Sequence, residues 1–405
     1  MPAPIAYFAA VFPNRSETFV YREVRELRRR GWDVRTVSLN DPKEPGLADF
    51  ADLEKGNTIV YGSGAGQTFL AMLAEGLRHP LRGARTKLTA LFDAIAPGEP
   101  MSIKNRLKTI VQGLAGIGIA RKLRKAGVKH IHCHFAHAPS SVGMYAAMEL
   151  GVPFSFTGHA NDLFQRRSLL TKKVRRAAFV ACISEWHRTF YESAGADVAK
   201  CHVIRCGVPV AEWTPRDLEH NRKPIEVLTV CRLVEKKGVD TLLRGLHDFT
   251  ARSRGAFHLT IAGDGEESNN LKALANELRL SASCEFLGAV SNDRVRELLS
   301  NADYFALPCR TDSHGDRDGI PVVLMEAMAC GVPVISGDLP AIRELITQGE
   351  SGMLVDGTKP EEVAKALMQL EDDEPLRARI AKGGRKRVES EFSLEENVSR
   401  LEKLM

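Results

Sequence analysis

The chain has 405 residues, of which 44% are hydrophobic and 26% charged, and its formal net charge is +5. This composition is typical of a soluble globular protein, and the length exceeds what one ordinary hydrophobic core organises, so two domains are expected. No apolar run reaches the roughly 18 residues of a membrane-spanning helix. The eight cysteines are scattered without a Cys-x-x-Cys pair, which excludes a zinc finger or a disulfide framework and indicates reduced thiols in a cytoplasmic protein.

The charge is distributed unevenly between the two halves. Residues 1–208 carry 30 Lys and Arg against 17 Asp and Glu, a balance of +13, whereas the remainder carries 26 against 34, a balance of −8. Basic clusters lie at Arg28–Arg30, Lys104–Lys108, Arg121–Lys125 and Arg166–Arg176. Such a half can dock on anionic lipid or attract nucleic acid, although each cluster can equally be a solvated helix face.

The first half alternates short apolar runs with helical patterns, which indicates parallel α/β structure. The start, Met1–Phe12, has no basic segment before its apolar run, so it is predicted to be a strand and not a signal peptide. The strands predicted in this half are Ile5–Phe8, Val34–Leu39, Ile131–Phe135, Phe154–Thr157 and Phe179–Ile183.

A polar segment with the sequence Phe-Pro-Asn-Arg-Ser-Glu-Thr-Phe, residues 12–19, joins the first strand to the first helix. Ser16 or Thr18 is suited to cap that helix, because a hydroxyl can accept a hydrogen bond from a first-turn N–H.

Residues 62–112 are harder to interpret. Gly62–Gly66 mimics a dinucleotide-binding loop, but Gln67 takes the place of the third glycine and no acidic residue ends a following strand, so no such cofactor is expected. The stretch Thr68–Val111 mixes Leu, Phe and Ala with Arg and Lys. It is either a membrane-facing amphipathic segment or a plain helical insertion.

Three histidines lie at predicted strand ends. His132 and His134 are two apart, so they share one face of a strand and could bind a metal; with no third ligand predictable nearby, a structural or site-lining role is favoured. His159 follows Gly158 at the end of the next strand and is predicted to project into the site, the alternative being a structural hydrogen bond.

The second half repeats the alternation, after a segment Gly207–Lys223 with the features of an interdomain linker. Its predicted strands are Ile225–Cys231, Phe257–Ala262, Cys284–Leu287, Tyr304–Leu307, Val334–Ile335 and Met353–Val355, and helical patterns run from Pro360 to Met405. Alternation in both halves predicts two doubly wound parallel sheets.

Two cations follow the first strand of this half. Arg232 stands at its carboxyl end and Lys237 five positions later, a placement suited to a diphosphate beyond the edge of an open sheet. A surface basic turn is the alternative. The next strands end at Gly263 and at Leu287, within Ile261–Glu266 and Glu285–Gly288, and each could also be a simple turn.

The segment Asp318–Ala329 carries two carboxylates eight positions apart. Gly319 allows close approach of the backbone to a ligand, and Pro321 suits the first position of a helix, whose unpaired N–H groups attract an anion. Glu326 would lie in the second turn, where it can accept hydrogen bonds from sugar hydroxyls. A buried helix capped by a polar turn is the alternative.

These motifs together resemble the retaining glycosyltransferases of family 4. The segment Asp318–Glu326 is similar to the family's Glu-x7-Glu motif with Asp in first place, and Arg232–Lys237 is similar to its Arg-x4-Lys pair, here preceded by Cys231 where Gly is common. Residues 12–19 resemble a Phe-Pro-x-x-Ser-Glu-Thr-Phe run of members that build bacterial surface polysaccharides. The resemblance spans nearly the whole chain.

The resemblance implies a GT-B fold of two Rossmann-like domains facing a cleft, with an acceptor domain at residues 1–208, a nucleotide-sugar domain at 209–385 and a C-terminal helix at 386–405 that packs back on the first domain. The implied catalytic residues are His159, Arg232, Lys237, Asp318 and Glu326. The implied nucleotide-sugar contacts are Gly263, Leu287, Gly319, Ile320, Val322 and Val323. The implied acceptor contacts are Ser16, Glu17, Thr18 and His134.

The implied reaction is transfer with retention, without metal or cofactor, from a UDP-sugar in preference to a GDP-sugar. The expected acceptor is a lipid-linked saccharide in polysaccharide biosynthesis. The protein itself is expected in the cytoplasm, where it can bind peripherally to an anionic membrane. Two other interpretations stay open: a GT-B sugar-nucleotide epimerase, which needs no acceptor, and a non-catalytic nucleotide-sugar-binding or membrane-scaffold protein. Nucleic-acid binding ranks last, because the basic half has no recognised motif or aromatic platform.

Overall fold

The computed structural model describes residues 2–14, 17–42, 50–54, 57–61, 74–75, 77–159, 163, 168–215, 224–253 and 256–405. The chain forms two compact units, Met1–Cys206 together with Asn397–Met405, and Gly207–Glu396. The Gly62–Gly66 segment and the latter part of the predicted linker, residues 216–223, lie outside the described residues. No helix of the described parts is long and apolar enough to cross a bilayer.

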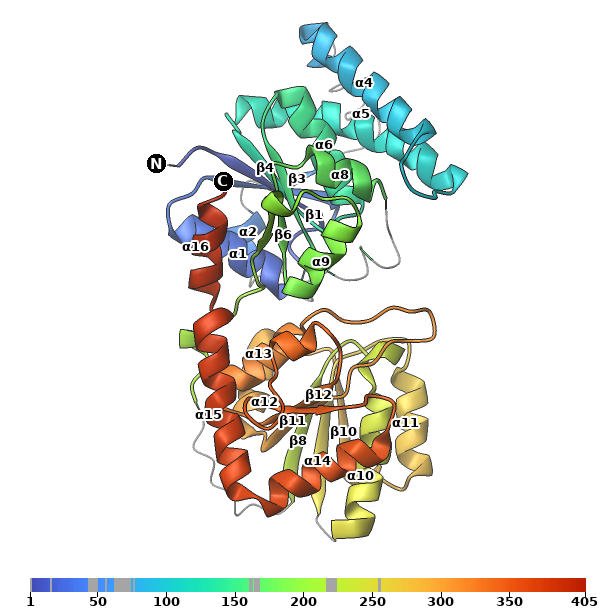
Figure 1. Cartoon of the computed structure of the whole chain (residues 1–405), viewed down its shortest axis with the longest axis vertical. Helices are drawn as coiled ribbons and strands as arrows, with labels where there is room; N and C mark the ends of the chain where they lie inside the picture. Colours follow the sequence, from blue (N-terminus) through green and yellow to red (C-terminus); the bar gives the residue numbers. More distant parts are fainter. Residues whose placement is uncertain are drawn as a thin grey trace. The chain divides into compact units, whose positions relative to one another are not determined.

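The first unit is built on a seven-stranded parallel sheet (Figure 1). Its strand order is β3-β2-β1-β4-β5-β6-β7, and β1 lies between β2 and β4, so the direction of winding reverses between β1 and β4. In open α/β sheets such a reversal creates a crevice at the carboxyl ends of the strands. The strands are β1 (Ile5–Val11), β2 (Val34–Asn40), β3 (Thr58–Ile59), β4 (His130–His134), β5 (Phe154–Gly158), β6 (Phe179–Cys182) and β7 (Cys201–Val203).

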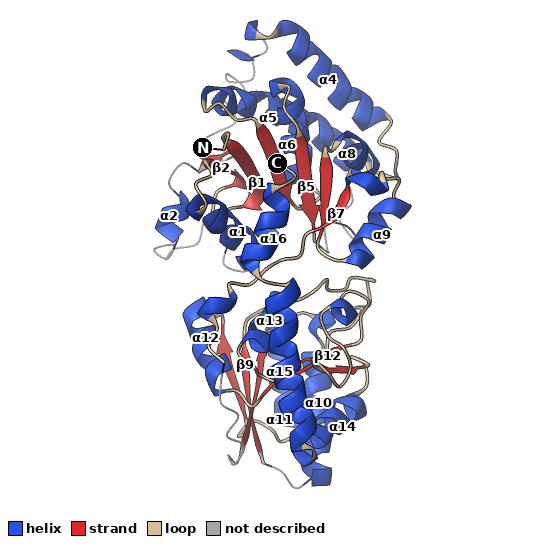
Figure 2. Cartoon of the chain, turned by 60° about the vertical axis from the view of Figure 1, so that its left-hand side comes forward, coloured by secondary structure: helices blue, strands red, loops and turns tan. Residues whose placement is uncertain are grey.

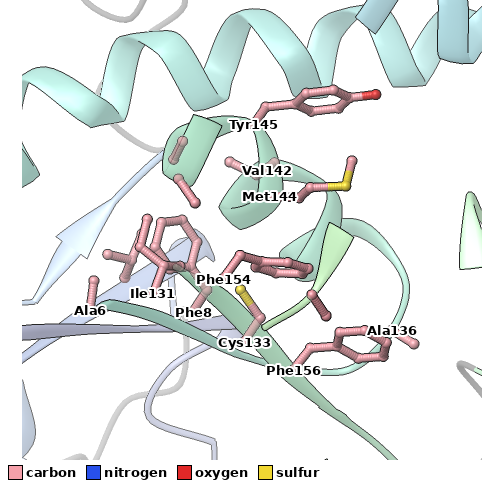
Figure 3. Packing of buried hydrophobic residues seen from close by; sticks show 14 of the residues in the cluster. Ala6, Phe8, Ile131, Cys133, Ala136, Val142, Met144, Tyr145, Phe154 and Phe156 are labelled. Atoms are coloured by element: carbon pink, nitrogen blue, oxygen red, sulfur yellow. The ribbon is translucent and has the colours of Figure 1, made fainter. Parts of the chain in front are cut away.

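The helices of the first unit cover both faces of this sheet (Figure 2). Apolar side chains of β1, β4 and β5 pack against α6, with Phe8, Cys133, Phe156 and Val142 all fully buried (Figure 3). The helices with described bounds are α1 (Thr18–Arg29), α2 (Ala51–Glu54), α4 (Pro80–Ile95), α5 (Ile103–Lys125), α6 (Ala138–Leu150), α8 (Leu170–Arg176) and α9 (Glu185–Ser193). The chain end joins this unit, since Glu402 of α16 (Leu394–Glu402) accepts hydrogen bonds from Arg30 and Trp32.

The second unit has a six-stranded parallel sheet in the order β10-β9-β8-β11-β12-β13, with its own reversal between β8 and β11. Its strands are β8 (Ile225–Val230), β9 (Phe257–Ala262), β10 (Cys284–Gly288), β11 (Tyr304–Leu307), β12 (Val334–Gly337) and β13 (Met353–Val355). Its helices are α10 (Val239–Ser253), α11 (Ser268–Glu277), α12 (Asn292–Asn301), α13 (Val322–Ala329), α14 (Pro360–Asp372) and α15 (Glu374–Glu391). Buried leucines of α10 and α14 pack on one face of the sheet.

The predicted strands all form, but the sequence missed β3 and β7. Both are edge strands of two or three residues, too short to show the alternation that marks a strand. Two helix starts also differ from the prediction. Glu17 is the N-cap of α1 and Thr18 is already helical, so Thr18 does not cap it, and Pro321 is the N-cap of α13 and not its first residue.

Lys173, within the predicted basic cluster Arg166–Arg176, is neither solvated nor available for docking. Its ammonium is fully buried and donates to the carbonyls of Ala136, His137 and Ser168 at 2.6–2.8 Å. Three carbonyl acceptors replace the water that the charge loses on burial, which is why a lysine is tolerated there. Its role is to hold the start of α8 against the end of β4.

Candidate functional site

An ion pair in the second unit joins two of the predicted catalytic residues. The Lys237 ammonium donates to Oδ2 of Asp318 at 2.9 Å, and both side chains are largely buried. Lys237 ends a 3₁₀ turn (Glu235–Lys237) just past β8, and Asp318 lies in the loop between β11 and α13. The reversal of the sheet between β8 and β11 is what brings these two loops together.

Asp318 is also bound by two neighbours that the sequence did not single out. Lys236 lies 3.4 Å from its Oδ1, and the Cys309 thiol donates to its Oδ2 at 3.2 Å. Lys236 in turn donates to the buried Asp316 at 2.9 Å. Asp318, which is one methylene shorter than the Glu usual in the family motif, is therefore held in place by two lysines and a thiol of the same unit.

The charges of this ion pair are set by burial and by each other. Burial disfavours the ammonium, but the Asp318 carboxylate outweighs it, and the pKa of Lys237 is raised. Burial likewise acts against the Asp318 carboxylate, but Lys237 and Lys236 outweigh it, and its pKa is lowered. Both groups are therefore charged throughout the neutral range. Lys237 has three N–H donors and gives one to Asp318, so it retains donors for phosphate oxygens.

Arg232 differs from Lys237 in being exposed. It lies two residues beyond the end of β8, and within the described part of the chain its guanidinium has no ion-pair partner. Its planar fork of donors is thus available to a phosphate group.

Backbone geometry at the ends of β9 and β10 explains the glycine predicted there. Gly263 has φ +135°, and a Cβ at this position would stand 1.8 Å from the carbonyl oxygen of Cys231. Its N–H donates to the carbonyl of Gly288 at 2.7 Å, which ties the two strand ends together. Leu287, the penultimate residue of β10, is half-buried beside this connection. Only glycine can hold the loop this close to the end of β8.

The start of α13 presents backbone donors without a side-chain cap. Pro321 is the N-cap and forms no capping hydrogen bond, so the first-turn N–H groups at Val322 and Val323 can serve an anion. Gly319 is buried and Ile320 half-buried in the loop that leads to them. Glu326, in the second turn, is 6% exposed and so lies against the body of the unit.

In the first unit a chain of polar groups runs from Glu23 to His159 at the reversal between β1 and β4. Oε1 of Glu23 accepts from the Tyr7 hydroxyl at 2.9 Å and lies 3.2 Å from Nε2 of His134. Nδ1 of His134 lies 3.2 Å from Nε2 of His159. When Nε2–H of His134 donates to the Glu23 carboxylate, Nδ1 of His134 can accept from Nε2–H of His159, and this contact fixes one tautomer of His159.

Aromatic rings enclose His159. Its ring centroid lies 4.3 Å from that of Phe19 on α1 and 4.9 Å from that of Phe135, and the side chain is buried. Burial, with the neighbouring histidines, lowers the pKa of His159 well below its usual value, so the ring is neutral at pH 7. His187 adds a hydrogen bond from its Nε2 to the carbonyl of His159 at 2.7 Å. A neutral imidazole carries no charge, and with its Nε2–H donated to His134 it can offer a sugar only Nδ1, which accepts a hydrogen bond.

Glu23, His132 and His134 form the group that comes nearest to a metal site among the described residues, with ligand atoms all within 4.8 Å of one another. The Glu23 carboxylate is the third ligand that the sequence could not supply. The ring nitrogens of His132, however, lie at 2.8 and 3.0 Å from the hydroxyls of Ser155 and Thr157. These contacts favour the structural role predicted for this histidine, because a metal would displace one of them.

The predicted acceptor contacts lie at the other side of the same reversal. Glu17 and Thr18 are half-buried at the start of α1, about one and a half turns before Glu23, and Ser16 lies outside the described residues. The structure therefore brings His134, His159 and the start of α1 together, while Arg232, Lys237, Asp318 and Glu326 lie at the carboxyl side of the other sheet. The sequence analysis gave no role to Glu23, Phe19, Lys236 or Asp316. Three of them lie in or beside its motifs: Phe19 ends the segment of residues 12–19, Lys236 precedes Lys237, and Asp316 lies two residues before Asp318.

Comparisons with known proteins agree with this layout. The model for "Glycosyltransferase Family 4" matches residues 16–212, and that for "Glycosyl transferases group 1" matches residues 212–387. The amylovoran biosynthesis glycosyltransferase AmsK of Erwinia amylovora is 32% identical over 411 residues, covering 96% of each chain. The putative colanic acid biosynthesis glycosyltransferase WcaL of Salmonella typhimurium is 30% identical over 373 residues, covering 90% of this chain and 88% of that protein.

Among solved structures, HepE of Anabaena in complex with UDP has a TM-score of 0.71 at 16% identity and covers 100% of this chain and 99% of its own. Two α/β units with parallel sheets give the chain the GT-B fold, as the sequence predicted, and the matching family models and relatives make it a glycosyltransferase. The chain belongs to glycosyltransferase family 4.

Proposed function

We propose that this glycosyltransferase moves a hexose from a nucleoside diphosphate sugar, UDP in preference to GDP, to a hydroxyl of a lipid-linked saccharide, with retention of configuration. The observation that carries the proposal is the pairing of Lys237 with Asp318 beside the uncapped start of α13. Together with the exposed Arg232, this edge of the sheet offers two cations and several backbone N–H donors, which is the set a diphosphate requires. The fold neighbour HepE was solved with UDP.

The chemistry proposed for these residues is electrostatic. As the bond between the anomeric carbon and the diphosphate oxygen breaks, negative charge grows on the diphosphate, and Arg232 and Lys237 would stabilise it. The acceptor oxygen bonds to the anomeric carbon on the face that the diphosphate leaves, and its proton passes to a diphosphate oxygen. This proposed transfer of the sugar and the proton needs no protein base, metal or cofactor. Asp318 would hold Lys237 in place and contact the donor sugar, and Glu326 would orient the ribose.

The first unit would then supply the acceptor side. His159, neutral and fixed by the chain from Glu23 through His134, is suited to hydrogen-bond a sugar at the reaction centre. Ser16, Glu17 and Thr18 would meet the acceptor. AmsK and WcaL are named for amylovoran and colanic acid biosynthesis, which supports a role in bacterial polysaccharide synthesis. We accordingly place the protein in the cytoplasm, at the inner face of the membrane where a lipid-linked acceptor would be found.

The experiment is a donor panel, in which thermal stabilisation and turnover are measured for UDP- and GDP-sugars with and without EDTA. The proposal expects one donor to stabilise the protein and to be consumed only when a lipid-linked acceptor is present, with EDTA having no effect. Conversion of the donor sugar without an acceptor would indicate an epimerase instead. Binding without any turnover in the presence of acceptors would indicate a non-catalytic protein.

A further inference from the structure

Large apolar side chains exposed to solvent are concentrated in one stretch of the first unit. Eleven such residues occur in the described part of the chain, and nine of them fall between residues 77 and 111. We define these nine as the α4–α5 apolar face: Leu77, Leu81, Leu88, Leu91, Phe92, Ile95, Ile103, Leu107 and Val111. Exposed fractions reach 86% at Leu81 and 78% at Ile103. Scattered apolar residues on a surface are ordinary, but a contiguous patch marks an interaction site.

The spacing of these residues puts them on one side of each helix. On α4, Leu81, Leu88, Phe92 and Ile95 recur at intervals of three, four and seven, so they form one stripe along the helix. On α5, the exposed residues recur at intervals of four through Ile103, Leu107 and Val111, in the half that precedes its buried part. Each helix therefore presents an apolar face outward.

Polar anchors fix which side of α4 points outward. On the inner side, Thr86 donates to Glu149 of α6 at 2.9 Å, and the buried Asp93 accepts from Tyr145 and from Arg176, each at 2.9 Å. Rotation of α4 to bury its leucines would break these hydrogen bonds and leave Glu149 and Asp93 without them.

Close packing holds α4 against α5 as well. Gly113 of α5 lies so near α4 that a Cβ there would stand 2.4 Å from Cβ of Ala90. Arg106 of α5 donates to the carbonyl of Ile95 at 2.7 Å, which ties the end of α4 to the start of α5. Figures 1 and 2 both show α4 on the outer side of α5, away from the sheet.

The charges around this face are nearly all positive. Residues 77–111 contain seven Lys and Arg and two carboxylates. Asp93 is buried and paired with Arg176, and Glu99 accepts a hydrogen bond from the backbone of Leu170 at 3.0 Å. The exposed cations beside the apolar side chains, none with an ion-pair partner in the described residues, are Arg78, Arg85, Lys87, Lys104 and Lys108.

We propose that the α4–α5 apolar face docks on the surface of an anionic lipid bilayer, with its Leu, Ile and Phe side chains inserted at the level of the headgroups and its Arg and Lys side chains on lipid phosphates. An apolar stripe bordered by unpaired cations is the pattern of helices that lie in a membrane interface. Long basic side chains can reach the phosphates while their stems lie along the apolar layer. A second copy of this chain is a poorer occupant, because it would set the same cations against each other.

This inference deepens the proposed function, since a lipid-linked acceptor would be met at such a surface, but its test needs no turnover. Flotation compares vesicles of phosphatidylcholine with and without phosphatidylglycerol, using the full chain and the double variant Leu88→Glu with Phe92→Glu. The expected result is binding of the wild-type protein to the anionic vesicles and a loss on the order of a hundredfold in the double variant. The matched control Val198→Glu, which changes an equally exposed apolar residue of the same unit, should bind as the wild type does.

A second variant tests the cations. Arg85→Gln with Lys87→Gln should weaken binding to the anionic vesicles about thirtyfold, because two cations are lost at roughly 1 kcal/mol each near the surface. Lys129→Gln, at an exposed lysine elsewhere on the unit, should leave binding unchanged. Circular dichroism and thermal unfolding check that every variant folds.

The proposal is overturned if the wild-type protein does not float with anionic vesicles, or if the double variant Leu88→Glu with Phe92→Glu binds as well as the control Val198→Glu. It is also overturned if the double variant instead converts a dimer into a monomer, which would assign the face to a second copy. Donor turnover in solution is measured separately, so the flotation result can still be interpreted if the proposed function fails.

Discussion

Buried histidines make the free energy of unfolding of the first unit depend on pH, and for His130 the size of this dependence can be calculated. Burial lowers the pKa of His130 from 6.5 to about 4, and its Nε2 lies 2.7 Å from the Ser155 hydroxyl. Below about pH 6.5 the unfolded chain binds a proton that the folded chain does not, so stability is fully present above that pH and is lost as the pH falls toward 4. At pH 5 the loss from His130 alone is about 2 kcal/mol, since each pH unit inside the window costs about 1.4 kcal/mol.

The assay is pulse proteolysis in urea at pH 7, 6 and 5, with fragments of each unit resolved by mass. Comparison of the wild-type protein with His130→Asn isolates this group, because all other titrations are common to both. The stability advantage of the wild-type protein should shrink by about 2 kcal/mol between pH 7 and pH 5. Burial also lowers the pKa of His132 and His159, so the whole unit should lose more than this share. An advantage that stays constant with pH would refute the reasoning that burial keeps His130 neutral.

Substitutions in the two candidate sites have distinct expected outcomes. Lys237→Met should keep the fold and lower transfer by about a hundredfold or more, because it removes one of the two cations that we propose to bind the diphosphate; near-normal initial rates would contradict this. Asp318→Asn should lower the free energy of unfolding in urea at pH 7, and the difference from wild type should shrink only below about pH 4, because the folded state lowers the pKa of this carboxyl. A difference that already changes at pH 6 would argue against the ion pair. Gly263→Ala should cost about 2 kcal/mol or more of stability by calorimetry, given φ +135° and the carbonyl of Cys231 at 1.8 Å; a neutral result would show that the loop can move. Glu23→Gln should leave the melting temperature within a few degrees and lower transfer on the order of tenfold, because His134 and His159, which we propose to contact the sugars, lose the carboxylate that anchors them.

The fold was predictable because buried strands and amphipathic helices leave periodic patterns that a short window of sequence contains. The strands Phe257–Ala262 and Tyr304–Leu307 form with the predicted bounds. The edge strands β3 and β7 have too few residues for any pattern, and their pairing depends on neighbours distant in sequence. The alternation of strands and helices thus predicted the architecture, whereas the edge strands depend on tertiary contacts that the sequence does not reveal.

The candidate sites were predictable only where a motif is local. Arg232, Lys237 and Glu326 follow from spacing within one loop or helix, whereas the contacts of Asp318 with Lys236 and Cys309 depend on how two loops meet at the sheet reversal. Glu23 is 111 residues from His134, and no short-range pattern indicates that they touch.

The sequence also could not predict which charged side chains are buried. Lys173 was counted in a surface cluster, but its ammonium is enclosed by three carbonyls. Composition records that a lysine is present, whereas its exposure depends on which loops fold around it.

The most direct test of the central claim is to follow the reaction of the best-stabilising nucleotide sugar by NMR, with and without a lipid-linked saccharide acceptor, for the wild-type protein and Lys237→Met. We predict a product with retained anomeric configuration that forms only with acceptor, does not require metal, and is nearly abolished in the variant. Donor conversion without acceptor, an inverted product, or unchanged turnover in Lys237→Met would contradict it.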